Sequence, residues 1–334
     1  MFKKLSIMAL ALASSTAFAG PFKLTSCPSG IPQALCNSLE AEVNKNLPDA
    51  DASNYLKGMS NASVTAGKGA TADYGTNFDL FVLGVTAGAG IDPGNQKATD
   101  FASGKVDTQQ LRGIGAQVNG LLGIKLSMLP GKFFERSKFY VNLGAFDKTS
   151  GDVKLKTSSY GAHYQYKLIK EKDFVRFKIF HWGGVDFTTG FEFSDLKLDY
   201  TKTLALTTTV SGQNATYNGP LSVNADVKTT SIPFELSTSL QYLYFLSTYV
   251  GLGADVSSGK SSVNASSSGT ITFPLAVAGA GSIDLGQSGK PDAFNARYFV
   301  GQQFNFPLLK IYAHVNQSFV NNTIGVAAGV KLAW

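Results

Sequence analysis

Alternation between apolar and polar residues is the feature that most constrains this chain. Between 112 and 126 the even positions are apolar or small, while Gln117 and Asn119 lie at odd positions. The same sorting recurs over 176–193 and 324–334. A period of two residues predicts strands with one apolar face and one polar face. The chain is therefore expected to be all-β.

Long apolar runs are missing from the sequence after its first twenty residues. The longest candidate, 273–283, is too short for a spanning helix, which needs roughly 18 uncharged apolar residues. With only 16% charged residues, the composition also excludes a disordered chain. If this protein crosses a membrane, it must do so with strands that pair in a closed barrel.

The N-terminus has the pattern of a secretory signal peptide. Lys3 and Lys4 form a positive start, an apolar run follows, and 17–19 is a small-x-small cleavage site, so residues 1–19 are expected to be removed. Without these two lysines the formal charge falls from +6 to +4, and no basic tract favours nucleic-acid binding. Lipid attachment at Cys27 is a weaker alternative, because Pro21 and Lys23 interrupt the apolar run before it.

Two cysteines, Cys27 and Cys36, lie close together after the leader. An exported protein meets an oxidising compartment, so we expect a local disulfide between them. Two unpaired structural thiols are the alternative.

Aromatic residues favour a membrane barrel over a soluble sandwich, which also alternates. Tyr164 and Tyr166 precede the turn at 170–173, Phe304 and Phe306 precede the next apparent turn at 307–309, and Trp334 ends the chain. Rings at strand ends on the apolar parity are typical of an interfacial girdle.

The turns predict ten strands, at 78–90, 112–126, 138–146, 158–169, 174–193, 231–245, 248–257, 294–306, 310–319 and 323–334. Short connections then share one rim, expected to be periplasmic, and long Ser-, Thr- and Asn-rich connections share the other. The alternating segments 196–210 and 270–285 are interpreted as hairpins that extend the wall. If either entered the bilayer, the barrel would have twelve strands.

With these features the chain resembles the outer-membrane β-barrel proteins of Gram-negative bacteria, over the leader and 78–334. The most specific element is the last strand, Ile324 to Trp334, which in that class looks like the signal for the barrel-assembly machinery. The resemblance implies a cell outer membrane location, with outer-membrane lipid and that machinery as partners. It carries no function by itself.

Residues 20–77 form a separate segment before the barrel at 78–334. Leu35, Leu39 and Val43 recur at helical spacing, and Pro48 follows, which predicts an amphipathic helix at about 32–47. The segment is either a periplasmic linker or a plug-like lid at the periplasmic mouth, where the acids of this segment would meet basic residues of the lumen.

Basic side chains on the inward parity gather towards the rim with the short turns. They are the candidates for a solute path: Lys125, Lys138, Lys167, Arg176, Lys178, Arg297, Lys310 and Lys331. We therefore expect a mildly basic lumen with a preference for anions.

These features favour a porin-like passive channel for small solutes. A surface-exposed structural or adhesive protein is the first alternative, because the long loops are rich in Ser, Thr and Asn. A channel for hydrophobic compounds is the second, suggested by the apolar run 273–277. With only three histidines, none of them in the long outer loops, we expect no enzymatic activity, no metal site and no cofactor. A homo-oligomer is left open.

Overall fold

The computed structural model describes residues 22–27, 33–46, 52–75, 80–94, 96, 100, 103, 105, 111–174, 180–210, 213–242, 244–273 and 276–334. The predicted signal peptide lies outside the described residues. Before the barrel come strand β1 (Phe22–Ser26), helices α2 (Gln33–Asn46) and α3 (Ala52–Ala66) and the 3-10 turn η2 (Lys68–Ala70).

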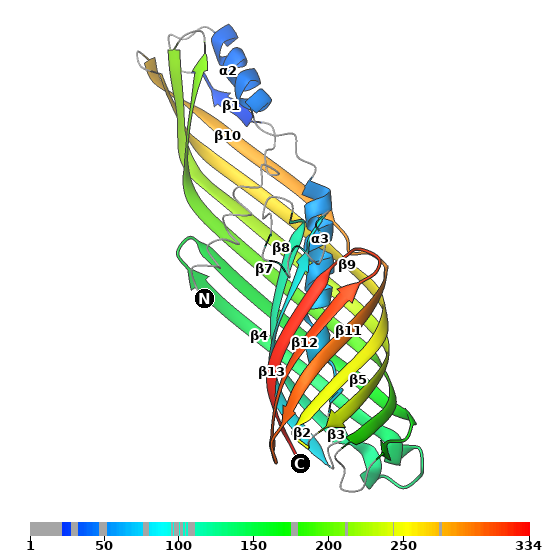
Figure 1. Cartoon of the computed structure of the whole chain (residues 1–334). Coiled ribbons are helices and arrows are strands. Elements are labelled where there is room, and N and C mark those ends of the chain that lie inside the picture. Colours follow the sequence, from blue (N-terminus) through cyan, green and yellow to red (C-terminus); the bar gives the residue numbers. More distant parts are fainter. Residues whose placement is uncertain are drawn as a thin grey trace.

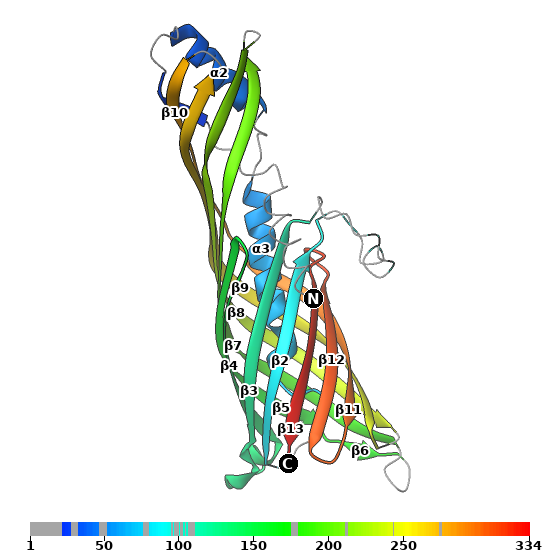
Figure 2. The same cartoon turned by 90° about the vertical axis from the view of Figure 1, so that its left-hand side faces the viewer.

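Ten antiparallel strands close into a barrel (Figures 1 and 2). They are β2 (Phe81–Asp92), β3 (Gly113–Lys125), β4 (Ser137–Ser150), β5 (Val153–Ile169), β7 (Phe180–Val210), β8 (Gln213–Tyr242), β9 (Leu246–Phe273), β11 (Phe294–Asn305), β12 (Leu309–Ser318) and β13 (Ile324–Ala333). Each pairs with the next in this order, and β13 pairs with β2 to complete the ring. The predicted ten-stranded barrel is confirmed.

Three ring strands are much longer than a membrane requires. β7, β8 and β9 have 31, 30 and 28 residues, whereas about 9–11 residues cross a bilayer. Their outer parts, together with β10 (Ala276–Gly289), form a sheet that rises beyond the other ring strands (Figure 1). We call residues 194–210, 213–231, 257–273 and 276–289 the projecting sheet. The twelve-strand alternative is wrong, because these segments extend the wall and add no strand to the ring.

The two faces of the ring differ in polarity. Outward positions are apolar and exposed, as at Val85, Leu143 and Leu252, where 60%, 63% and 61% of the side chain is accessible. Inward positions carry buried polar groups such as Asn119, Thr188 and Gln303. An apolar exterior around a polar interior is the pattern of a membrane barrel.

None of the described helices is long and apolar enough to cross a membrane.

Aromatic rings collect at the end of the barrel that carries the short turns, which we call the short-turn end. Trp334 lies 6.2 Å from Phe81, ring centre to ring centre. The turn between β3 and β4, which contains the 3-10 turns η4 (Leu126–Met128) and η5 (Phe134–Arg136), places Phe133 5.3 Å from Tyr166. A two-residue strand, β6 (Lys172–Asp173), precedes β7 at the same end.

The first helix lies far from the short-turn end. β1 pairs with the free edge of β10, and the Cys27–Cys36 disulfide joins the end of β1 to α2. The backbone N–H of Leu24 donates to Glu40 at 3.1 Å. Figures 1 and 2 show α2 beside the tip of the projecting sheet. The lid alternative, in which this helix docks at the end with the short turns, is wrong, because pairing of β1 with β10 places the helix at the opposite end.

Candidate functional site

The lumen is occupied by the segment that follows α2. α3 enters the ring from the side of the projecting sheet and runs down beside β2 and β3, which both views show (Figures 1 and 2). After η2, the chain continues to Tyr74 inside the lumen, and β2 begins near the short-turn end. We call residues 61–75 the plug.

Glycines on the wall allow α3 to lie this close. A Cβ atom built on Gly90 would lie 2.0 Å from the carbonyl oxygen of Ala62, and one built on Gly115 would lie 2.7 Å from the backbone of Ala62 and Ser63. Only residues without a side chain leave room for the helix at these two positions. Glycine usually weakens a strand, but in β2 and β3 these glycines form the surface on which α3 packs.

Replacing Gly115 with Val is expected to push α3 off the wall and to cost about 1–3 kcal/mol of folding free energy. The folded fraction in a urea series, read from migration on unboiled gels, measures the loss. Gly120→Val on the same strand is the matched control, because a Cβ there would meet no atom closer than 3.5 Å and points outward. Equal urea midpoints for the two variants would contradict the close approach of α3.

The upper half of α3 is anchored by apolar contacts beyond the ring. Leu56 and Met59 are buried in a cluster with residues from β5, β7, β8 and β9. Those partners are Val153, Leu155, Leu196, Leu198, Tyr200, Val223, Ala225, Val227, Val263 and Ala265. Burial of this many apolar side chains ties the helix firmly to the inner face of the projecting sheet.

A polar latch holds the same helix to the connection between β10 and β11. Lys57 Nζ lies 2.7 Å from the Asp292 carboxylate, and the Asn61 amide donates to that carboxylate at 2.9 Å. Burial raises the pKa of the Asp292 carboxyl, but hydrogen bonds from Lys57, Asn321 and Asn61 outweigh it and leave the pKa below its usual value. The carboxylate is therefore charged at neutral pH, when the latch is formed.

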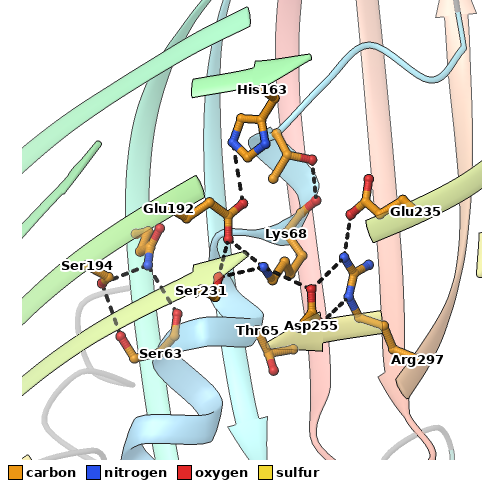
Figure 3. A network of polar contacts seen from close by, with 12 residues as sticks. Ser63, Thr65, Lys68, His163, Glu192, Ser194, Ser231, Glu235, Asp255 and Arg297 are labelled. Carbon is orange, nitrogen blue, oxygen red and sulfur yellow. Dashed lines mark hydrogen bonds and ion pairs between the residues drawn. The ribbon is translucent and has the colours of Figure 1, made fainter. Parts of the chain in front are cut away.

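Lys68, at the start of η2, is fully buried in the middle of the lumen. Its ammonium group lies 2.5 Å from Glu192 and 3.2 Å from Asp255, and it also donates to the Ser231 hydroxyl at 2.9 Å (Figure 3). Two carboxylates from two different strands thus hold one lysine of the plug. A buried charge is tolerated only with such partners.

Arg297 of β11 extends this network along the wall to two further strands. Its guanidinium bridges Asp255, at 2.8 Å, and Glu235 (Figure 3). Glu235 in turn accepts a hydrogen bond of 2.6 Å from the Tyr74 hydroxyl. The plug is therefore tied to one continuous network at both Lys68 and Tyr74.

Polar contacts continue above and below this network. Above it, the Gln117 amide donates to the backbone oxygen of Ser63 at 3.1 Å and to the Ser194 hydroxyl at 2.8 Å. Below it, Lys331 pairs with Asp73 at 3.3 Å.

Rings fill the space beside the lower part of the plug. The centre of the Tyr74 ring lies 5.0 Å from Phe299, 5.5 Å from Tyr249 and 6.0 Å from His314. These rings pack around Tyr74 in one buried cluster on the side of the plug nearer the short-turn end.

The structure places the predicted lumen residues at two levels. Arg297 lies in the central network, while Lys125, Lys138, Lys167, Lys310 and Lys331 lie towards the short-turn end. Arg176 and Lys178 lie outside the described residues, as do the side chains of the apolar run 273–277.

The residues that matter most for the lumen were missed by the sequence analysis. Glu192, Glu235 and Asp255 neutralise the central cations, so the expected surplus of positive charge is limited to the lower lumen. Glu192 lies on the inward parity of its strand, and that signal could have found it. Lys68 carried no such signal, because its partners are 124 and more residues away in the chain.

Among the described residues, no group of three or more His, Cys, Asp or Glu side chains is placed to hold a metal ion.

The family comparison covers most of the chain. A family model described as Lsa36-like matches residues 21–334. The chain belongs to the Lsa36-like family. A comparison with curated protein sequences gives no match for this member.

Solved structures similar to this Lsa36-like chain are barrels of low sequence identity. The translocator domain of autotransporter NalP from Neisseria meningitidis shares 10% identity, with 90% of this chain and 97% of that chain covered and a TM-score of 0.31. A major outer membrane protein from Thermus thermophilus shares 11% identity, with 64% and 100% covered and a TM-score of 0.28. Ail of Yersinia pestis shares 11% identity, with 76% and 98% covered and a TM-score of 0.23.

Proposed function

We propose that this protein is an integral outer-membrane barrel that displays the projecting sheet, with β1 and α2 at its tip, on the cell surface. The observation that carries the proposal is the length of β7, β8 and β9, which have 28–31 residues where about 9–11 cross a bilayer. Short turns face the periplasm in barrels of this kind, so the projecting sheet faces outward. The role is structural or adhesive, with the barrel as the anchor.

Helix α3 and the plug support this role in two ways. The upper half of α3, just before the plug, stiffens the projecting sheet where the sheet leaves the ring, because Leu56 and Met59 pack against four strands there. The plug itself occupies the lumen around Lys68, so we expect no open path through the centre of the barrel at rest. A filled lumen and a stiffened projecting sheet favour a barrel that anchors this sheet in the membrane over a channel that is permanently open.

Cysteine labelling on intact cells tests the orientation. Thr207→Cys lies on the projecting sheet and Lys170→Cys lies in a short turn, and both positions are exposed. A membrane-impermeant maleimide is expected to label the first variant on intact cells and the second only after lysis. Labelling in the reverse order would overturn the proposal. The native cysteines do not interfere, because Cys27 and Cys36 form a disulfide.

A porin-like passive channel is the second candidate, with one observation in its favour. Between Ser63 and Tyr74 the plug meets the wall largely through polar and charged groups, including Lys68. Water can replace such contacts at a lower cost than it can solvate an apolar interface. Solutes would then pass only while the plug is withdrawn.

A further inference from the structure

A pocket of about 320 Å³ opens at the short-turn end of the lumen. Five of its lining residues are basic, namely Lys125, Arg136, Lys138, Lys167 and Lys170, and two are acidic, Glu135 and Glu171. Its volume lies at the lower end of the range for small-molecule sites. We call it the basic vestibule.

The positive charges of the vestibule are only partly neutralised. Lys167 has two carboxylates near it, Asp186 at 3.3 Å and Glu171 at 3.6 Å. Within the part of the chain that the structure describes, Lys125, Arg136 and Lys170 form no ion pair. Three cationic side chains around one hollow are therefore available to a ligand.

The strand register places two positive charges directly opposite each other in the wall of the vestibule. Lys125 of β3 lies directly opposite Lys138 of β4, and Lys138 is only 5% exposed. Like charges in directly opposed positions of neighbouring strands destabilise the pair. Asp186 and Asp73 offset part of this repulsion at Lys138. An anion beside Lys125, Arg136 and Lys170 would offset more of it, with an attraction stronger here than in open water.

The vestibule ends inside the barrel. Tyr140, two residues from Lys138 on the same inward face, is fully buried, and its hydroxyl donates to Gln165 at 3.0 Å. Tyr249, Phe299 and the plug residue Tyr74 lie in the same buried cluster. An anion that enters from the short-turn end therefore stops at this layer.

We propose that the basic vestibule binds a polyvalent anion of the phosphate-ester class. A single negative charge would leave most of the basic side chains unmatched, whereas a diphosphate group meets several. Arg136 offers the planar donor pair that suits phosphate oxygens, and Lys125 and Lys170 offer point charges. The ligand is either a soluble phosphorylated compound or the headgroup of an anionic lipid. The inference holds whichever role the projecting sheet has.

Titration calorimetry with inorganic pyrophosphate tests the site on the full mature chain in an uncharged detergent. We expect saturable binding to one site, weakened at least about tenfold in the double variant Lys125→Gln, Arg136→Gln. The matched control is Lys156→Gln, Lys197→Gln, which removes two lysines from outside the vestibule and should bind as the unmodified chain does. Heat-modifiable migration on gels shows that each variant is folded.

Equal affinity in the two double variants, or no saturable binding to the unmodified chain, would overturn the proposal. The source of the anion is assigned by repeating the titration in vesicles. If an anionic headgroup occupies the vestibule, phosphatidylglycerol vesicles abolish pyrophosphate binding and phosphatidylcholine vesicles do not. If the ligand is soluble, pyrophosphate binds equally in both.

Discussion

Deleting residues 20–75 is expected to turn a barrel that carries no measurable current into one with discrete open steps in planar bilayers. The deletion removes α3 and the plug, including Lys68 and Tyr74, which fill the centre of the lumen. Glu192, Glu235 and Asp255 would then face water, where a charged group needs no protein partner. The ring itself is retained, because none of its ten strands lies in the deleted segment.

Deleting only residues 20–51 is the matched control for this experiment. It removes β1 and α2 but keeps α3 and the plug, so the barrel should stay closed. Currents from the unmodified chain equal to those of the long deletion would show that the plug does not block the pore. Opening by the short deletion would show that α2 is needed to keep the plug in place.

Replacing Arg297 with Met is expected to destabilise the barrel by about 3–5 kcal/mol. The guanidinium is only 1% exposed and is shared by Asp255 and Glu235, both of them fully buried. Without it, Glu235 loses its cation, and Asp255 keeps only Lys68. The shift of the urea midpoint, read from migration on unboiled gels or from Trp emission, measures this cost.

Lys228→Met provides the comparison for a surface charge. The Lys228 side chain is 52% exposed, and its carboxylate partners Asp195 and Asp226 lie 4.0 Å away. Exposed pairs of this kind contribute about 0–1 kcal/mol. If Arg297→Met lowered the free energy of unfolding no more than Lys228→Met does, the claim that Arg297 belongs to a buried ion-pair network would be contradicted.

The strands were predictable because the alternation of apolar and polar residues within each strand shows which side chains face outward and which face the lumen. In the last strand, Val326, Val330 and Leu332 face lipid and alternate with inward Lys331, so the period of two is visible without any other part of the chain. Turn residues then set the number of strands in the ring. The projecting sheet was also visible as alternation in the long connections, since its inner face is apolar.

The plug was not predictable for the opposite reason. The surroundings of α3 change along its length, from an apolar cluster at Leu56 to polar partners at Ser63. From residue 58 to residue 66 every position of the helix is buried, polar side chains such as Ser63 included, so an apolar face alone does not predict its contacts. The partners of Lys68 lie on distant strands, so its role is defined only once the ring has closed. The helical spacing of Leu35, Leu39 and Val43 predicted α2, whereas α3 was not predicted.

The path of α3 through the ring has a consequence for biogenesis. β13 pairs with β2, so the barrel is closed by its first and last strands. The segment that precedes the first strand runs through the interior of the barrel. If the ring closed before this segment took its place, β1, α2 and the loop closed by their disulfide would have to pass through the interior of the finished barrel. Pairing of β13 with β2 around a segment that is already in place avoids that passage, so we expect this pair of strands to form last.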